Sequence, residues 1–216
     1  MKGALRGARL QSRGEEIANS LSHGVALVAA AAGVPFLLFR TPVPSLASLV
    51  GSAVFAVTML TLYMSSTLYH ALPAGRAKAV MLRFDHGAIF FFIAGTYTPF
   101  ALGEIGGAWG WTLFALVWVL AAAGAGLKAA DRLSHPWLST ALYLAMGWLV
   151  LAAAMPMAGR LPHAGMWLLA AGGIAYTAGV GFFLVDSRRR YAHAIWHCFV
   201  AAGTGCHFFA VLGYAG

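Results

Sequence analysis

The amino-acid sequence predicts an all-α polytopic membrane protein, a bundle of seven transmembrane helices with a cytoplasmic N-terminus and a C-terminus outside. Three observations support this fold class. Of the 216 residues, 61% are hydrophobic and 9% are charged, whereas an ordinary soluble domain has about 25% charged residues. The apolar residues form runs that are long enough to cross about 30 Å of hydrocarbon. Basic residues collect in alternate segments between these runs.

The spans follow one another closely and predict one domain over residues 1–216, with a basic cytoplasmic arm at residues 1–14. They are expected at residues 22–39, 46–70, 84–102, 109–127, 137–157, 165–185 and 192–214. The first run follows a basic arm, as the apolar part of a signal peptide does, but six further spans favour a membrane anchor. Glu104 is expected in the glycine-rich loop between the third and fourth spans.

The basic residues predict the orientation. Only Arg40 and Arg160 fall on the side opposite the N-terminus. The other twelve of the fourteen are Lys2, Arg6, Arg9, Arg13, Arg76, Lys78, Arg83, Lys128, Arg132, Arg188, Arg189 and Arg190. By the positive-inside rule this side is cytoplasmic. The net charge of +8 is therefore interpreted as topology and lipid-headgroup contact, with a specific acidic partner as the alternative. Nucleic acid is not expected, because no aromatic residues alternate with the basic ones.

Polar residues occur at three span ends on the predicted cytoplasmic side. They are Ser66 and His70 in SSTLYH, Asp85 and His86 in RFDHG, and His193 and His197 in HAIWH. Polar groups at membrane depth cost several kcal/mol unless they find partners. The three ends are therefore expected to meet.

The histidines in this set indicate a metal site. His193 and His197 are four residues apart and project from one side of a helix, close enough to hold a single ion. A third imidazole from His70 would complete a three-histidine site with an open fourth position, which is typical of catalytic zinc. Asp85 would offset the charge of the ion, as a direct ligand or through a bound water. For HAIWH alone, a packing or proton-relay pair is the alternative.

The other histidines are not expected to bind this ion. His86 is turned roughly 100° away from the preceding aspartate on a helix. His207 lies about 15 Å beyond the histidine pair along the same helix. His135 and His163 fall in predicted loops.

A polar stripe precedes the first span. In EEIANSLSH, Glu16, Asn19 and His23 share one helical face. One interpretation is a helix start, where acidic residues are favoured by the positive end of the helix dipole. The other is a polar wall of the same cytoplasmic cavity.

The chain resembles the bacterial hemolysin III-like membrane proteins of the progestin and adiponectin receptor superfamily, including their membrane-homeostasis members. The superfamily is grouped with alkaline ceramidases as membrane hydrolases. The resemblance covers nearly the whole chain and rests on EEIANSLSHG (15–24), SSTLYHALP (65–73), DHGAIFFFIAGTYTPF (85–100), LYLAMGW (142–148) and HAIWHCFV (193–200).

The resemblance implies a seven-helix bundle with a zinc ion near the cytoplasmic side. It places the metal ligands at His70, His193 and His197, accompanied by Ser66 and Asp85. The chain lacks the long N-terminal domain of the animal receptors, so hormone binding is not expected.

The leading functional hypothesis is a zinc-dependent hydrolase of a membrane-lipid amide or ester in the bacterial inner membrane. Asp85 would hold and deprotonate the attacking water, and Ser66 would bond to Asp85 or to the developing oxyanion. A non-enzymatic membrane-state sensor with structural zinc is the main alternative. A pore-forming hemolysin is disfavoured because few polar residues could line a channel. A proton-coupled transporter is disfavoured because acidic groups deep in the membrane are lacking.

Overall fold

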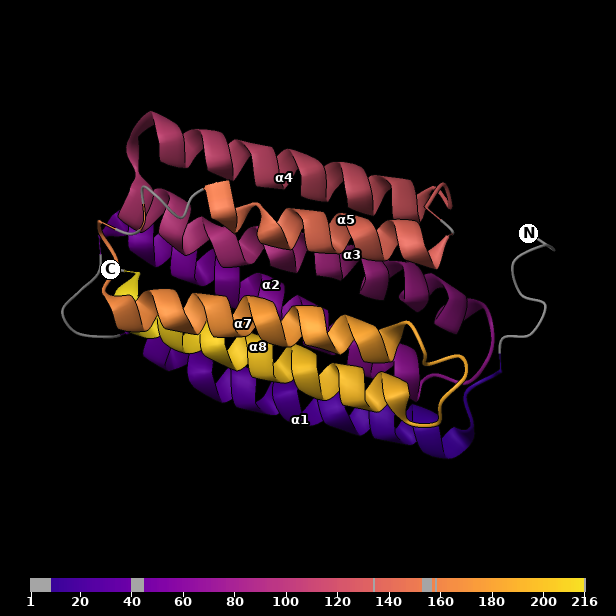
Figure 1. The fold of residues 1–216 in the computed structure, drawn as a ribbon. Helices are drawn as coiled ribbons and strands as arrows, with labels where there is room; N and C mark the ends of the chain where they lie inside the picture. Colours follow the sequence, from indigo (N-terminus) through magenta and orange to yellow (C-terminus); the bar gives the residue numbers. More distant parts are fainter. Residues whose placement is uncertain (1–8, 40–44, 134, 153–156, 158, 216) are drawn as a thin grey trace.

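The protein is a bundle of helices that run alternately in opposite directions (Figure 1). The computed structural model describes residues 9–39, 45–133, 135–152, 157 and 159–215. Arg40, Gly216, residues 1–8 of the predicted basic arm and part of the end of the fifth predicted span lie outside the described residues.

The helices account for nearly all of the described chain. They are α1 (Arg13–Leu38), α2 (Leu46–Ala71), α3 (Arg76–Pro99), the π-helix η1 (Phe100–Ile105), α4 (Gly107–Ala129), α5 (Pro136–Trp148), α7 (His163–Phe183) and α8 (Ala192–Tyr214). Within the described residues, six spans are long and apolar enough to cross a membrane, with α3 and η1 forming one of them, and Trp137–Ala152 is a shorter apolar helix. The prediction of an all-α polytopic membrane protein is confirmed.

Helices α1 and α3 begin more than one turn before the apolar runs predicted. Helix α1 starts at Arg13, where Ser12 and Glu15 form a capping box that satisfies free N–H groups of the first turn. Helix α3 starts at Arg76, so the basic segment expected as a loop is already helical. Hydropathy misses both starts because their first turns are polar, although Arg, Lys and Ala are good helix formers.

The end of the third span also differs from the prediction. Glu104, which was expected in a loop, lies in η1, the π-helical continuation of α3. The turn follows at Gly106 and Gly107, both at φ +57°, a conformation that glycine adopts without steric cost. Arg160 donates hydrogen bonds from Nη1 to the carbonyl oxygens of Glu104 and Ile105, at 2.7 and 2.6 Å. These bonds satisfy acceptors that a helix end leaves free.

The span predicted at 137–157 is interrupted: α5 ends at Trp148, and residues 150–152 are helical again after a turn at Leu149. The hydroxyl of Tyr97 on α3 donates to the carbonyl oxygens of Met146 and Gly147, at 2.8 and 2.7 Å. These carbonyls lie in the last turn of α5, where the helix gives way to a turn at Leu149. The helix end is thus anchored to α3.

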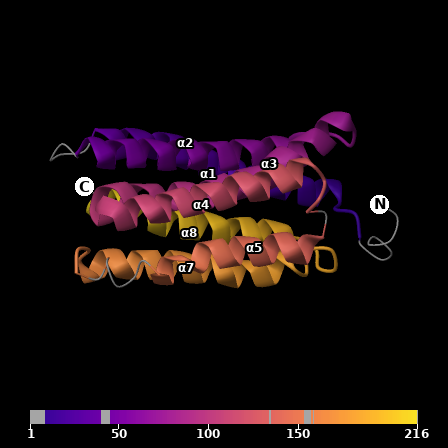
Figure 2. The ribbon, with the colours of Figure 1, turned by 90° about the horizontal axis from the view of Figure 1, so that it is seen from above.

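The helices form neighbouring pairs. Helix α1 lies between α2 and α8, α3 packs between α2 and α4, and α7 packs along α8 (Figures 1 and 2). Small residues permit close approach in membrane helices: a Cβ atom added at Gly124 of α4 would overlap the ring of Phe90 on α3. Helix α5 touches α3, α4 and α7 only lightly.

The exterior of the bundle is more apolar than that of a soluble protein, and polar side chains are buried within its apolar core. Large apolar side chains are exposed along the helices, including Val25, Val28, Leu120, Val119 and Phe209. Buried polar or charged side chains include Glu15, Asn19, His23, Ser66, His70, Asp85 and His197. An apolar exterior fits a lipid environment, and buried polar groups in such a protein mark functional or packing sites.

Candidate metal centre

Three histidines meet at one end of the bundle. His70 lies in the last turn of α2, and His193 and His197 lie in the first turns of α8. One nitrogen from each residue lies within 4.8 Å of the other two. Among the described residues, this is the one group of three or more His, Cys, Asp or Glu side chains close enough to hold a metal ion. The convergence predicted from the sequence is confirmed.

The local fold explains how the pair on α8 is presented. Tyr191, in the left-handed region at φ 59°, ends the α7–α8 loop and precedes the first helical residue. Its backbone N–H donates to Oε1 of Glu15 at 3.1 Å, which ties the start of α8 to the start of α1. The four-residue spacing then places both imidazoles on one side of α8, with ring centroids 4.7 Å apart.

Two of the histidines are held by carboxylates. Nδ1 of His70 lies 2.7 Å from Oε2 of Glu16, and Nδ1 of His193 lies 2.7 Å from Oδ2 of Asp186. Because an ionised carboxylate can only accept a hydrogen bond, each Nδ1 carries the proton and each Nε2 keeps its lone pair.

The third histidine is held by a carbonyl and a hydroxyl. Nδ1 of His197 lies 3.1 Å from the backbone oxygen of Asn19 and 3.0 Å from Oγ of Ser22. Ser22 donates its own proton to that same carbonyl, at 2.9 Å, so its oxygen is free to accept from His197. This imidazole too is expected to present Nε2 as its free lone pair.

The arrangement fits a zinc ion. Nε2 of His70 is buried and has no hydrogen-bond partner, which is costly for a polar atom unless something else binds it. Three neutral imidazoles, each fixed through its other nitrogen, are the usual ligand pattern of a zinc site with an open position. The identity of the ion is not determined by these ligands alone, since imidazole also suits other transition metals.

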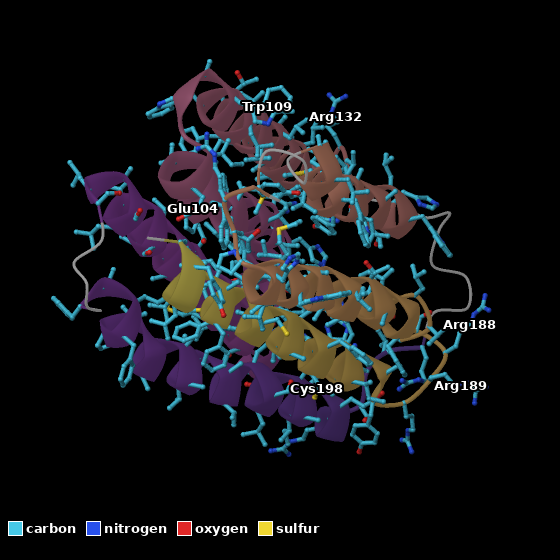
Figure 3. The ribbon with its side chains drawn as sticks, turned by 60° about the vertical axis from the view of Figure 1, so that its left-hand side comes forward. Glu104, Trp109, Arg132, Arg188, Arg189 and Cys198 are labelled. Carbon is cyan, nitrogen blue, oxygen red and sulfur yellow. The ribbon has the colours of Figure 1, made fainter. Side chains whose placement is uncertain are left out.

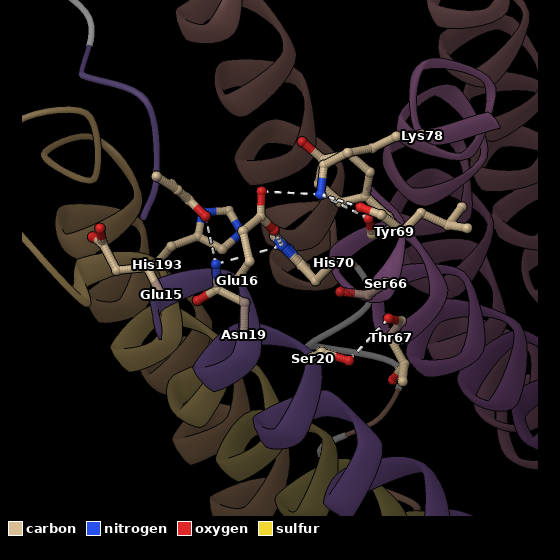
Figure 4. A network of polar contacts seen from close by, with 12 residues as sticks. Glu15, Glu16, Asn19, Ser20, Ser66, Thr67, Tyr69, His70, Lys78 and His193 are labelled. Atoms are coloured by element: carbon tan, nitrogen blue, oxygen red, sulfur yellow. Dashed lines mark hydrogen bonds and ion pairs between the residues drawn. The ribbon is translucent and has the colours of Figure 1, made fainter. Parts of the chain in front are cut away.

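The stripe before the first span forms a wall of this centre (Figure 4). Besides holding His70, Glu16 pairs with Lys78 at 2.9 Å. Asn19 and His23 are fully buried against the histidines. These contacts agree with the interpretation of Glu16, Asn19 and His23 as a polar wall, and not with that of a helix start. The helix-start role belongs to Glu15, which caps α1 and accepts two bonds from Arg9, both at 2.5 Å. These bonds raise the pKa of Arg9.

Two partners of the centre, Asp186 and Ser22, are not predicted by the sequence patterns. Asp186 lies in the α7–α8 loop, seven residues before His193. The one feature of the sequence that could have pointed to Asp186 is that the chain has only six acidic residues. Ser22 carried no signal, because serine is common at all helix positions.

Ser66 and Asp85 lie beside the centre and are both buried. Both side chains line the same cavity, and a hydrogen bond between Ser66 and Asp85 stays a prediction. Ser66 also contacts His23, whose Nδ1 is 2.7 Å from the serine Oγ. Asp85 is not in the metal-holding group, so it is not one of the ligand atoms that come together, and its role through a bound water stays a prediction.

A cavity of about 270 Å³ begins at this point. His23, Ser66 and Asp85 line the cavity, and its walls run along α3, α5, α7 and α8 to Phe100 and Ile105 near the opposite end of the bundle. The remaining lining is mostly apolar, with a few polar side chains such as Thr96, Thr177 and His207. A mostly apolar cavity with a few polar groups is typical of a ligand-binding site.

The other histidines lie apart from the metal-holding group, as predicted. His207 packs against Tyr176, and its Nε2 lies 3.4 Å from the carbonyl oxygen of Leu169. His86 is partly buried on α3. His135 precedes α5 and is exposed, whereas His163, expected in a loop, is the first residue of α7.

Comparisons with known proteins agree with the geometry. A family model described as haemolysin-III related matches residues 11–208. Hemolysin-3 homolog of Bacillus subtilis (strain 168) is 41% identical over 201 residues, which cover 93% of this chain and 94% of the relative. Hemolysin-3 of Bacillus cereus is 39% identical over 201 residues, covering 93% and 91%. Human monocyte to macrophage differentiation factor is 28% identical over 170 residues, covering 74% and 68%.

The resemblance inferred from the sequence motifs is therefore confirmed. The matched region contains every helix of the bundle at least in part, and it includes all three histidines of the metal centre. The chain is an integral membrane protein that belongs to the haemolysin-III related family.

Proposed function

We propose that this protein is a zinc-dependent hydrolase that cleaves an amide or ester bond of a membrane lipid, in the inner membrane of a bacterium. The observation that carries the proposal is the position of the histidine centre. Three imidazoles come together with fixed Nδ1 atoms, His23 stacks on one of them and contacts Ser66, and Ser66 and Asp85 both line a mostly apolar cavity.

His70, His193 and His197 would hold the zinc ion through Nε2. Bound zinc supplies a Lewis acid that polarises a carbonyl group and makes water a stronger nucleophile at neutral pH. Glu16 and Asp186 keep two of the imidazoles in the required tautomer and orientation.

The protein side chains would carry the proton transfers. Asp85 would accept the proton of the attacking water and later give it to the leaving group. Ser66 would orient the Asp85 carboxylate, or donate to the oxygen on which negative charge develops. The apolar walls of the cavity would bind the acyl chain and exclude bulk water from the reacting bond.

The orientation proposed for the bundle has the metal centre on the cytoplasmic side. Basic residues at the α2–α3, α4–α5 and α7–α8 connections lie at the same end as the start of α1, whereas Glu104 and Trp109 lie toward the other end (Figures 1 and 3). The positive-inside rule supports this orientation.

A non-enzymatic sensor with structural metal is the second candidate. It is favoured by the fact that the three ligands and their hydrogen-bond partners come from α1, α2, α8 and the α7–α8 loop. An ion held there would connect elements from both ends of the sequence. A pore-former is less well supported, because the lining of the cavity is mostly apolar.

The two candidates are separated by measuring zinc content and hydrolysis on the same purified variants. The substrates are N-acyl and O-acyl membrane lipids that carry a fluorescent acyl chain, and the readout is released fatty acid. Wild type is expected to hold about one zinc per chain and to release fatty acid. Asp85→Ala should keep its zinc but lose about 100-fold or more in rate, since it removes the general base.

Each of His70→Ala, His193→Ala and His197→Ala should lose both zinc and activity, whereas His86→Ala and Glu104→Gln should keep both. Zinc-loaded wild type that releases no fatty acid from any lipid of the panel would favour the sensor. Full zinc occupancy in the His193→Ala, His197→Ala double variant would exclude the site itself.

A further inference from the structure

Residues 9–12 lie at the end of the bundle that holds the three histidines, and several hydrogen bonds fix them there. Arg9 donates from Nη1 and Nη2 to the carboxylate of Glu15. Its backbone N–H donates to the carbonyl oxygen of Ser187 at 3.3 Å, and its Nη2 lies 3.4 Å from the carbonyl oxygen of Arg189. Residues 9–12, called the strap below, therefore connect the start of α1 to the α7–α8 loop.

The strap shields polar groups that support the metal centre. Oε1 of Gln11 accepts a hydrogen bond from Nδ2 of Asn19 at 2.6 Å, and Asn19 is fully buried although it lies in the second turn of α1. The backbone oxygen of Asn19 holds His197. The Glu15 carboxylate is buried too, and it accepts hydrogen bonds from both ends of the strap. The start of α1 is therefore closed off from this end of the bundle by the strap.

A hollow beside the strap reaches one of the three ligands from outside the bundle. It measures about 670 Å³ and lies between the start of α1, the end of α2 and the start of α3. Gln11, Glu16, His70 and Lys78 are among the residues that line it. Among the described residues, the 270 Å³ cavity is lined by none of the three ligands. The hollow is thus the space through which a hydrated cation could approach the ligand set.

The wall between the hollow and the metal centre has a rigid part and a part that can move. Glu16 joins His70 to Lys78, and Nζ of Lys78 also donates to two carbonyl oxygens at the end of α2, at 3.0 and 3.2 Å (Figure 4). All three ammonium protons are thereby used, so this part is fixed between helices. Gln11 belongs to the strap, which is not helical. The strap can therefore lift without breaking a helix.

We propose that the strap closes the entrance of the metal centre at this end of the bundle, and that the ion enters and leaves through the hollow beside His70 when the strap lifts. The inference rests on the metal site of the proposed function and does not depend on hydrolysis. Lifting separates Arg9 from Glu15 and Gln11 from Asn19, and it leaves the ligands and the bonds to their Nδ1 atoms in place. The strap therefore controls the rate of metal exchange and not the affinity.

The test measures both rates of zinc exchange on the full-length purified protein in lipid nanodiscs. Loading is followed with a fluorescent zinc indicator after zinc-free protein is mixed with zinc. Release is followed after zinc-loaded protein is mixed with an excess of a chromophoric chelator. In Arg9→Gln both rates should rise about tenfold, the size of effect expected for losing one hydrogen bond between charged groups. Their ratio, which gives the dissociation constant, should stay within about twofold of wild type.

Two further variants separate the strap from its surroundings. Gln11→Ala removes the side chain that contacts Asn19, and it should also raise both rates because it widens the passage from the hollow. Arg188→Gln is the matched control, since it removes one positive charge from an exposed side chain of the α7–α8 loop. Both of its rates should equal those of wild type. Circular dichroism of the zinc-free proteins confirms that each variant is folded.

Equal exchange rates in wild type and Arg9→Gln would overturn the inference and leave the proposed function intact. Faster release without faster loading would also overturn it, because the strap would then support the ligands and not close an entrance. A similar rise in Arg188→Gln would show that charge alone sets the rates. Wild type that binds no zinc would remove the metal site together with the inference. The expected rates without any hydrolysis would retain the strap and count against the hydrolase.

Discussion

At the residue scale, the metal centre depends on atoms that never touch the ion. Each Nδ1 of the three histidines has an acceptor, and two of these acceptors are the carboxylates of Glu16 and Asp186. Such partners orient the ring and raise the basicity of the ligand nitrogen. The residues that hold the histidines are thus part of the metal centre. Removing one of these hydrogen-bond partners should lower the affinity for the metal.

Asp186→Ala is expected to weaken zinc binding by about 10- to 100-fold, the usual effect of removing such a partner. His193 would then lose the group that fixes its proton on Nδ1. Zinc affinity is measured by competition with a chromophoric chelator. Asp131→Ala is the control, since this aspartate lies in the α4–α5 turn away from the centre. Equal affinities for the two variants would show that the Asp186–His193 contact does not support the metal.

At the element scale, close helix contacts depend on individual glycines. Gly124 faces the ring of Phe90, which is itself buried and packs against Tyr143 with ring centroids 4.4 Å apart. A methyl group there would force α3 and α4 apart or displace a ring that has little room to move. Two residues later, a Cβ atom added at Gly126 would have no neighbouring atom within 4 Å.

The pair Gly124→Ala and Gly126→Ala tests this contact within one helix. Alanine favours the helix by about 1 kcal/mol over glycine, so Gly126→Ala should leave the melting temperature unchanged or raise it. Gly124→Ala should lower it, because overpacking typically costs about 1–3 kcal/mol. Thermal unfolding in detergent, followed by circular dichroism, provides the comparison. Matching melting temperatures would mean that α4 does not pack on Phe90 as described.

At the scale of the whole molecule, the orientation in the membrane follows from charge. Reporter fusions after Arg76, Arg132 and Arg189 should report a cytoplasmic location, and a fusion at the C-terminus should report the outer side. The physical reason is the retention of basic segments in the cytoplasm during insertion. A cytoplasmic C-terminus would require an even number of spans and would contradict the proposal that the apolar helix Trp137–Ala152 belongs to a seventh.

The metal is also expected to stabilise the assembled bundle. Its ligands come from α2 and α8, and their partners from α1 and the α7–α8 loop, so the site exists only when these elements are together. An ion at 100 times its dissociation constant contributes about 2.7 kcal/mol. Chelation should therefore lower the melting temperature of wild type and leave that of His197→Ala nearly unchanged. An equal shift in both would show that the chelator acts elsewhere.

Much of this protein can be predicted from the sequence because the signals are local. A run of apolar residues indicates a membrane helix wherever it packs, and spacings of four residues put Ser66 beside His70 and His193 beside His197 on their helices. Charge on alternate loops then indicates that these helix ends belong to one side. The family, the helical class and the three converging histidines were all accessible in this way.

Tertiary structure decided what depends on contacts between distant segments. The carbonyl of Asn19 meets His197 across 178 positions of sequence, and no local pattern encodes that pairing. The partner of His193 is Asp186, and the last turn of α5 is held by a hydroxyl on α3. The cavity is lined by residues of α2, α3, α5, α7 and α8, which are far apart in the sequence. Periodicity reports which face of a helix is polar, whereas the partner of each polar group is set by the packing of the whole bundle.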